Sequence, residues 1–576
     1  MTDIDGRIDA LMGKMDLRDK VGQCLTLNFT GYTIADYHRR FIREFRCGGL
    51  RVTPHITGVN DDYDIRKLAP HVTPGEYTAV MRELQEMALE RNGVPLHLVT
   101  DQEGDLSVDF LRGGLQLFPS AMGLAATNDP ALVRKAWRVV AEQLRAHGIS
   151  WIHSPVLDVN INPRNPEIGM RSFSDDPKIC ARYGIPTMKG LLAGGVIATG
   201  KHFPGRGDSE IDAHDDLDVL RADRRRLHDV ELYPYRALIK AGLPAIMTAH
   251  NAYPALDESL TPASVSYKIT TELLRREMGF DGVITTDAIG MAGLLKFAGG
   301  QWGATVMAIK AGADLVLIKE DEATTERCFA ALLAAVKSGE ISESRIDESV
   351  KRILRAKALV RVLDDPLPNP ARASKVIGRP KQAAICRATF EKGSIEVRDR
   401  DGLIPLGRDA RVLAVEPYIP IYHGKGDDAH YHPGMFGEWM KRHSDNVTWL
   451  EINSPASPDD LQRFERRAAA ADVIAFFNIF WRGSASNRPL IRQAVKMGKR
   501  VILATNDLYD GHFLPTVGTI LCTFGAVAGG THIAADVIYG TAKAGGTWPL
   551  RRIGQTDTVA EGEEVDHVIA GHFAKL

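Results

Sequence analysis

The run Leu96-His97-Leu98-Val99-Thr100 leads directly into Asp101-Gln102-Glu103-Gly104. A short run of apolar and β-branched residues that stops at a polar turn is typical of a buried strand. The same succession recurs at three later points, where strand-like runs lead into Lys201-His202, His250-Asn251 and Asp287. In a barrel of parallel strands, the side chains that follow the strands gather on one face. We therefore expect a catalytic cup at the carboxyl ends of such strands.

Strand-like runs alternate with helical patterns along the first part of the chain. The helical patterns include Glu76–Arg91, Ala131–Ala146 and Lys178–Leu191. This alternation is typical of βαβ units in a parallel sheet. The strand candidates are Val21–Phe29, Gly48–Thr53, Leu96–Thr100, Ser150–Leu157, Gly195–Gly200, Ala245–Thr248, Gly282–Thr286 and Asp314–Ile318. The fold class is thus predicted to be α/β, with a (β/α)8 TIM-type barrel over residues 1–362.

A second domain is expected after a proline-rich connection. Three prolines fall within Asp364–Pro370, and proline resists helix and removes backbone donors. We predict a linker over residues 363–385. Further apolar runs alternate with helical stretches beyond it, which predicts a smaller α/β sandwich domain over residues 386–576 with about five strands in an open sheet.

Composition narrows the classes of function. The 71 Lys and Arg residues nearly balance 73 Asp and Glu residues, so no general positive field favours nucleic acid or an anionic membrane. The sequence begins without the pattern of a secretory signal, and the six cysteines are scattered without CxxC spacing. We expect a cytoplasmic protein with reduced thiols and no cofactor.

The densest group of reactive side chains lies in Lys201–His214. Gly205 and Gly207 permit unusual backbone angles, so this stretch can fold over the barrel mouth. Asp212 and His214 could form a carboxylate–imidazole pair that exchanges protons near neutral pH. The alternative is a solvated acidic loop, since Asp215, Asp216 and Asp218 follow.

The chain resembles glycoside hydrolase family 3, in particular its β-N-acetylhexosaminidase branch. The resemblance rests on five motifs in the family's order: Asp101–Gly104, Asn162–Phe173, Lys201–His214, His250–Asp257 and Gly279–Met291. More weakly, the second half resembles the α/β sandwich that accompanies the barrel in many members, most clearly at Ala528–Tyr539.

The resemblance implies a retaining exo-β-glycosidase, with a β-N-acetylglucosaminidase as the expected activity on a small soluble glycoconjugate. It makes Asp287 the nucleophile and His214, oriented by Asp212, the acid/base. The substrate-binding candidates are Asp101, Arg171, Lys201, His202, His250 and Met291. For His250, a buried histidine that is hydrogen-bonded to a neighbouring loop is the structural alternative.

The sequence departs from the family pattern at four positions. Asp105 and Asp109 stand near places where the branch usually has glycine and basic residues, which argues against an acidic sugar beside this loop. Arg206 replaces a usual histidine, and Ala213 replaces a usual serine. These changes leave the proposed pair intact but alter its surroundings.

Several alternatives stay open. A phosphorylase or a β-glucosidase could use the same site, and a non-catalytic sugar-binding protein is the option from another class. Lys201 could instead form a Schiff base, as in barrel aldolases. His423, His430 and His432, with Asp427 and Asp428, could bind a metal, but their spacing matches no helix-borne motif, and we expect no metal. Their loop could instead reach the barrel mouth of this chain or of a partner in a homodimer.

Overall fold

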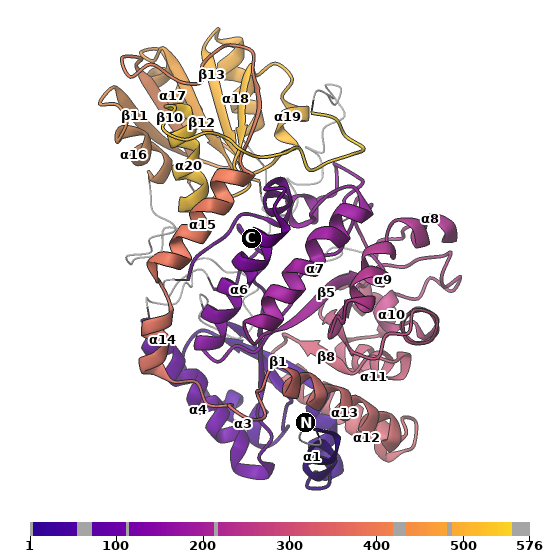
Figure 1. Cartoon of the computed structure of the whole chain (residues 1–576). Helices are drawn as coiled ribbons and strands as arrows, with labels where there is room; N and C mark the ends of the chain where they lie inside the picture. Colours follow the sequence, from indigo (N-terminus) through magenta and orange to yellow (C-terminus); the bar gives the residue numbers. More distant parts are fainter. Residues whose placement is uncertain are drawn as a thin grey trace.

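A computed structural model of the chain describes residues 4–54, 72–110, 115–211, 217–418, 434–480 and 487–555. Its first part is a closed barrel of eight parallel strands, which confirms the predicted fold class (Figure 1). The strands are β1 (Leu25–Thr30), β2 (Gly49–Thr53), β3 (His97–Thr100), β4 (Trp151–Ile152), β5 (Ile197–Phe203), β6 (Ala245–Thr248), β7 (Val283–Ala288) and β8 (Leu315–Ile318).

Four strands differ clearly in length from the prediction. The predicted strand Val21–Phe29 begins only at Leu25, because Val21–Gln23 belong to helix α2 (Leu17–Gln23). β4 stops at Ile152, since Pro155 in the predicted strand has no N–H to donate to a ladder. β5 and β7 run further than expected and remain buried or half-buried. Lys201, His202 and Asp287 therefore lie within the last three residues of these strands, where the hydrogen-bonded backbone holds them.

Helices surround the barrel. They are α1 (Ile4–Met12), α2 (Leu17–Gln23), α3 (Asp36–Arg43), α4 (Pro74–Asn92), α5 (Ala121–Ala126), α6 (Pro130–Ala146), α7 (Pro177–Ala193), α8 (Arg224–Asp229), α9 (Tyr233–Lys240), η4 (Lys268–Glu277), α10 (Ala292–Ala298), α11 (Gln301–Ala311), α12 (Glu322–Lys337) and α13 (Glu343–Leu359). Local chemistry sets their ends: α4 begins with a capping box of Thr73 and Glu76 and ends at Gly93, whose φ is 75°. Two short 3-10 helices, η2 (Gly169–Arg171) and η3 (Ala263–Val265), lie in loops.

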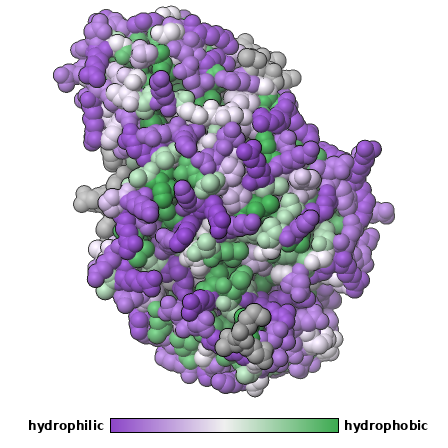
Figure 2. All heavy atoms as spheres, in the orientation of Figure 1, coloured by the Kyte–Doolittle hydropathy of each residue, from purple (hydrophilic) through white to green (hydrophobic). Residues whose placement is uncertain are grey.

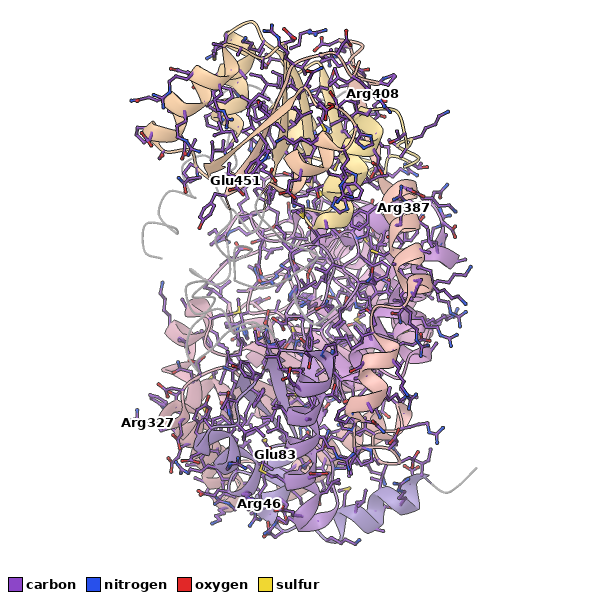
Figure 3. The ribbon with its side chains drawn as sticks, turned by 90° about the vertical axis from the view of Figure 1, so that its left-hand side faces the viewer. Arg46, Glu83, Arg327, Arg387, Arg408 and Glu451 are labelled. Carbon is purple, nitrogen blue, oxygen red and sulfur yellow. The ribbon has the colours of Figure 1, made fainter. Side chains whose placement is uncertain are left out.

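The connection to the second domain is partly helical. α14 (Pro370–Val376) and α15 (Pro380–Gly393) both begin at a proline, which suits the first turn of a helix because the nitrogen there needs no partner. Figure 1 shows α15 running from the barrel to the second domain. In the turned view of Figure 3, Arg387 of α15 lies between the second domain, which carries Arg408 and Glu451, and the barrel end marked by Arg46 and Glu83.

The second domain contains a six-stranded sheet in the order β11-β10-β12-β13-β14-β9. Five strands are parallel: β10 (Val412–Tyr418), β11 (Val447–Asn453), β12 (Val473–Asn478), β13 (Arg500–Thr505) and β14 (Thr519–Cys522). The sixth, β9 (Ile395–Asp399), is antiparallel to β14 at one edge. The accompanying helices are α16 (Met435–Lys441), α17 (Pro458–Ala468), α18 (Arg488–Lys496), α19 (Asp510–Phe513) and α20 (Ala528–Ile538).

The second domain touches loops at the carboxyl ends of the barrel strands. Asn160 donates a hydrogen bond from its Nδ2 to the Tyr509 hydroxyl over 2.8 Å, and the Ser120 N–H donates to the Phe524 carbonyl over 2.9 Å. The face in Figure 2 is mostly hydrophilic, with hydrophobic residues gathered between polar bands. In the described part of the chain, every helix is too short or too polar to cross a bilayer.

Candidate active site

The predicted gathering of charged side chains is present at the carboxyl end of the barrel. β3 leads into Asp101 and Glu103, β5 carries Lys201 and His202, and β7 carries Asp287. Arg171 comes from η2, in the long connection after β4. These side chains join through ion pairs, so residues that are far apart in the sequence form one charged cluster.

Lys201 bridges two carboxylates. Its Nζ lies 2.8 Å from Asp101 Oδ1 and 2.6 Å from Glu103 Oε1. Burial alone would lower the pKa of Lys201, but Asp101 and Glu103 outweigh it and raise the pKa above its usual value. A Schiff-base lysine needs a neutral amine, which a lowered pKa supplies. The charge of Lys201 therefore argues against the aldolase alternative.

Asp101 has a second cation beside it. Arg51 donates from its Nη2 to Asp101 Oδ2 over 2.8 Å, and Arg51 also pairs with Asp109 at 3.0 Å. Although burial would raise the pKa of Asp101, Lys201, His153 and Arg51 hold it well below its usual range. Asp101 is therefore an ionised acceptor, suited to accept a charge-assisted hydrogen bond from a sugar hydroxyl.

Arg171 connects two acidic residues. Its Nε and Nη2 donate to the two carboxylate oxygens of Glu103 over 2.7 and 3.0 Å, and its Nη1 lies 3.3 Å from Glu167 Oε1. This bidentate pair fixes the plane of the guanidinium. Glu167 in turn accepts from Arg206 Nη2 over 2.7 Å. The cluster thus alternates in charge from Asp101 through Lys201, Glu103 and Arg171 to Glu167 and Arg206.

Asp287 lies at the end of this series. Its side chain is 18% exposed, so Asp287, like Asp101 at 23%, is a partly open carboxylate next to buried charges. Oδ1 accepts from the Ala288 N–H over 2.8 Å, and Oδ2 lies 3.9 Å from both His202 Nε2 and Arg206 Nη2. Burial would raise the pKa of Asp287, but Arg206 and then His250 and Lys201 hold it well below its usual range. An ionised carboxylate here can act as a nucleophile toward a group bound in the cup.

His202 is oriented by a residue that sequence reasoning missed. Asp158 is fully buried, and its Oδ2 lies 2.7 Å from His202 Nδ1. Asp158 also accepts from the backbone N–H groups of His202 and Arg206. Burial lowers the pKa of His202 well below its usual value, so the ring is neutral and donates through Nδ1. The sequence signal was a charged residue directly after a predicted buried strand.

His250 has the geometry of the structural alternative, a buried histidine that is hydrogen-bonded to a neighbouring loop. Its Nδ1 lies 2.7 Å from Ser264 Oγ and its Nε2 lies 2.9 Å from the Ala288 carbonyl, so both ring nitrogens contact the protein. Through Ala288 it supports the backbone next to Asp287. Met291 is buried at the N-cap of α10, close behind the same strand end in sequence.

The two unexpected acids have structural partners. Asp109 pairs with Arg51 and accepts from the Asp101 N–H over 2.7 Å. Asp105 reaches the second domain, where Asn506 Nδ2 and the Ala526 N–H donate to it over 2.8 and 2.6 Å. Both carboxylates are thus used within the protein, and the expectation that no acidic sugar lies beside this loop stays a prediction.

Some candidates lie outside the described residues. These are Asp212 and His214, the neighbouring Ala213, Asp215 and Asp216, and the group of His423, Asp427, Asp428, His430 and His432. Within the described ranges, we find no cluster of three side chains that could hold a metal ion.

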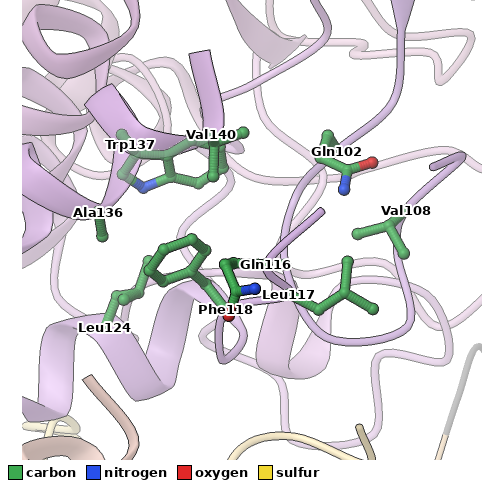
Figure 4. Close-up of a pocket in the computed structure, with 10 residues that line it drawn as sticks. Gln102, Val108, Gln116, Leu117, Phe118, Leu124, Ala136, Trp137 and Val140 are labelled. Carbon is green, nitrogen blue, oxygen red and sulfur yellow. The ribbon is translucent and has the colours of Figure 1, made fainter. Parts of the chain in front are cut away.

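A small cavity lies beside the loop that contains Gln102 and Gly104 (Figure 4). It measures about 10 Å³ and is lined mainly by apolar side chains, among them Val108, Phe118, Leu124 and Trp137, with Gln102 at one side. Such a volume holds about one water molecule. It is therefore a packing defect beside Asp101–Gly104 and too small for a sugar.

The chain is similar to known glycoside hydrolases both in sequence and in structure. Residues 17–356 match the model of the glycosyl hydrolase family 3 N terminal domain. The chain is 27% identical to beta-hexosaminidase A of Pseudoalteromonas piscicida, over 92% of this chain and 96% of the relative. It is 27% identical to a beta-N-acetylglucosaminidase/beta-glucosidase of Cellulomonas fimi, over 84% and 88% of the two chains. A family 3 beta-N-acetylglucosaminidase from Paenibacillus sp. superposes with a TM-score of 0.81 at 29% identity, covering 95% of this chain and all of that one.

Proposed function

Because the chain belongs to glycosyl hydrolase family 3 and is a β-glycosidase, we propose that it is a retaining, exo-acting β-N-acetylglucosaminidase. The observation that carries the mechanism is the ionised, partly exposed Asp287 at the end of β7, beside a series of buried charges. The match to a family 3 beta-N-acetylglucosaminidase over nearly the whole chain supports the choice of sugar. Asp101, Arg171, Lys201 and His202 would bind the hydroxyl groups.

The proposed reaction has two displacements. Asp287 attacks the anomeric carbon, and the bond to the leaving oxygen breaks as His214, held by Asp212, donates a proton to it. Water then attacks the same carbon and gives its proton back to His214. The bond between the sugar and Asp287 breaks, and its electron pair returns to the carboxylate. Two inversions at one carbon leave the β configuration unchanged.

The test is a panel of aryl β-glycosides, including N-acetylglucosaminide and glucoside, assayed with and without inorganic phosphate. We expect the N-acetylglucosaminide to be the better substrate, free sugar as the product in both buffers, and the β anomer as the first product seen by NMR. A first-formed α anomer would reject the double displacement. Faster cleavage of the glucoside would reject the choice of sugar.

A sugar phosphate as the main product would show that the protein is a phosphorylase and not a hydrolase. This alternative has a chemical reason: a histidine is neutral as a base and repels phosphate less than a carboxylate does.

A further inference from the structure

Arg206 is the buried cation nearest to the proposed nucleophile. Its side chain is only 2% exposed, and its Nη2 lies 3.9 Å from Asp287 Oδ2 and 2.7 Å from Glu167 Oε1. The backbone is held as firmly: the Arg206 N–H donates to Asp158 Oδ1 over 2.8 Å, and its carbonyl accepts from Asn165 Nδ2 over 2.8 Å. Arg206 is therefore fixed beside the carboxylate before any substrate binds.

Two donors of this guanidinium are unused. Nε and Nη1 of Arg206 are buried and have no hydrogen-bond partner among the described residues. Burying donors of a charged group without partners is costly, so such an arrangement calls for an explanation. The nearest anion, Glu167, is shared with Arg171. Packing alone does not explain a guanidinium at this place.

We infer that Arg206 is a positioning residue for Asp287: it holds the carboxylate ionised before attack and receives it as an anion when the sugar leaves. This inference rests on the proposed function, since it takes Asp287 as the nucleophile. Charge on Asp287 disappears when the glycosyl ester forms and returns when that ester is hydrolysed. A permanent cation beside Oδ2 therefore favours the second step, in which the carboxylate is the leaving group.

His250 and Lys201, the other side chains that lower the pKa of Asp287, have partners of their own. Lys201 already has two carboxylate partners at 2.8 and 2.6 Å. His202 is neutral because burial lowers its pKa, and His250 contacts Ser264 and the Ala288 carbonyl. The Ala288 N–H contributes one hydrogen bond to Oδ1.

The test compares Arg206→Met, which removes the charge, with Arg206→Lys, which keeps it. We expect the acidic limb of kcat/KM to move to higher pH by about 1–3 units in the Met variant, because an opposite charge within ~4–6 Å lowers a carboxyl pKa by that amount. The glycosyl ester should also accumulate, seen as a burst of aryl alcohol. The Lys variant should keep most of the wild-type profile.

Arg275→Met is the matched control. Arg275 is a largely buried arginine with 12% side-chain exposure, but it pairs with Asp314, whose Oδ2 accepts from the Ile284 N–H near the other end of β7. Its loss should lower the melting temperature without moving the acidic limb. An unchanged acidic limb in folded Arg206→Met protein would overturn the inference.

Glu167→Gln gives a second reading that does not depend on the folding of the Met variant. It leaves Arg206 in place and removes its other anion, so the acidic limb should stay or move to lower pH; a rise would overturn the inference.

Failure of the proposed function can be told apart from failure of this inference. If a 2-deoxy-2-fluoro glycoside does not label Asp287 in the wild type, the proposed function fails, whereas labelling with an unmoved limb in Arg206→Met rejects only the role of Arg206.

Discussion

Asp158 shows how one buried carboxylate fixes a side chain that faces the cup. It accepts hydrogen bonds from His202 Nδ1, from the His202 N–H and from the Arg206 N–H, so it sets both the ring and the backbone beside it. Burial raises the pKa of Asp158 to about 6, and Arg206 with the backbone donors offsets part of this rise. The side chain is fully buried and therefore acts through His202 and Arg206.

We expect Asp158→Asn to fold but to lower kcat/KM by about 10- to 100-fold, because a hydrogen bond to a charged group contributes roughly 1.5–3 kcal/mol. An amide would place its N–H₂ against one of these donors or release the imidazole. Steady-state kinetics with an aryl N-acetylglucosaminide, beside a melting curve, measures the effect. Wild-type kcat/KM in the variant would show that the orientation of His202 is unimportant.

A second residue-level prediction concerns the pair in the loop after β5. If His214 protonates the leaving oxygen, His214→Ala should slow substrates with poor leaving groups far more than nitrophenyl glycosides, which depart with little proton assistance. Asp212→Asn should show the same pattern more mildly and should shift the basic limb to lower pH, since losing the carboxylate lowers the histidine pKa. Equal losses for good and poor leaving groups would make this stretch a substrate-holding loop.

At the scale of elements, the strands could be predicted because each is a short apolar run that ends in a polar turn. The placement of Asp101, Lys201 and Asp287 on one face followed from the same pattern, since parallel strands of a barrel end together. The antiparallel β9 escaped prediction, because its partner β14 lies about 120 residues away and nothing local indicates the pairing.

The ion pairs of Glu167 and Asp158 escaped prediction for the same reason. Each joins a loop residue to Arg206 or His202, dozens of positions away. The sequence can show that a strand ends in a charge, but it does not show which distant charge meets it.

The loop after β3 makes a contact whose strength should depend on pH. Asp105 accepts from Asn506 Nδ2 and the Ala526 N–H, and burial raises its pKa from 3.8 to about 7. The folded-state pKa lies above the unfolded value, so ionisation of this group costs stability. Its contribution is therefore fully present below pH ~4 and is lost as the pH rises to about 7.

Urea denaturation of the wild type and Asp105→Asn at several pH values tests this contact. The variant has no such titration, so the stability difference between the two proteins should change between pH ~4 and ~7 and stay constant above that range. Asp229→Asn, at an exposed position of α8, should keep the wild-type pH dependence. Parallel curves for wild type and Asp105→Asn would contradict the assignment.

At the scale of the whole molecule, the largest of three hydrophobic clusters spans both domains. A single cluster of buried residues contains Ile284 of β7, Phe390 of α15 and Leu521 of β14. Gly123 of α5 lies so close to Phe524 that an added Cβ would approach the Phe524 Cβ to 2.4 Å. The barrel and the second domain are therefore in close apolar contact at this point.

This packing predicts one cooperative unfolding transition for the full chain in differential scanning calorimetry. The reason is that unfolding of either domain would expose apolar surface of the other. A calorimetric enthalpy equal to the van't Hoff enthalpy would agree with this prediction. Two resolved transitions would show that the domains unfold independently and that the interface contributes little.

The central claim is that Asp287 forms a covalent bond to the sugar. The most direct measurement is mass spectrometry of peptides from enzyme treated with an activated 2-deoxy-2-fluoro β-glycoside, whose fluorine slows hydrolysis of the glycosyl ester. We predict one added sugar, located on Asp287 in the peptide that contains β7, and no adduct in Asp287→Ala. An adduct on Asp101 or Glu103 instead would contradict the account and move the nucleophile to the loop after β3.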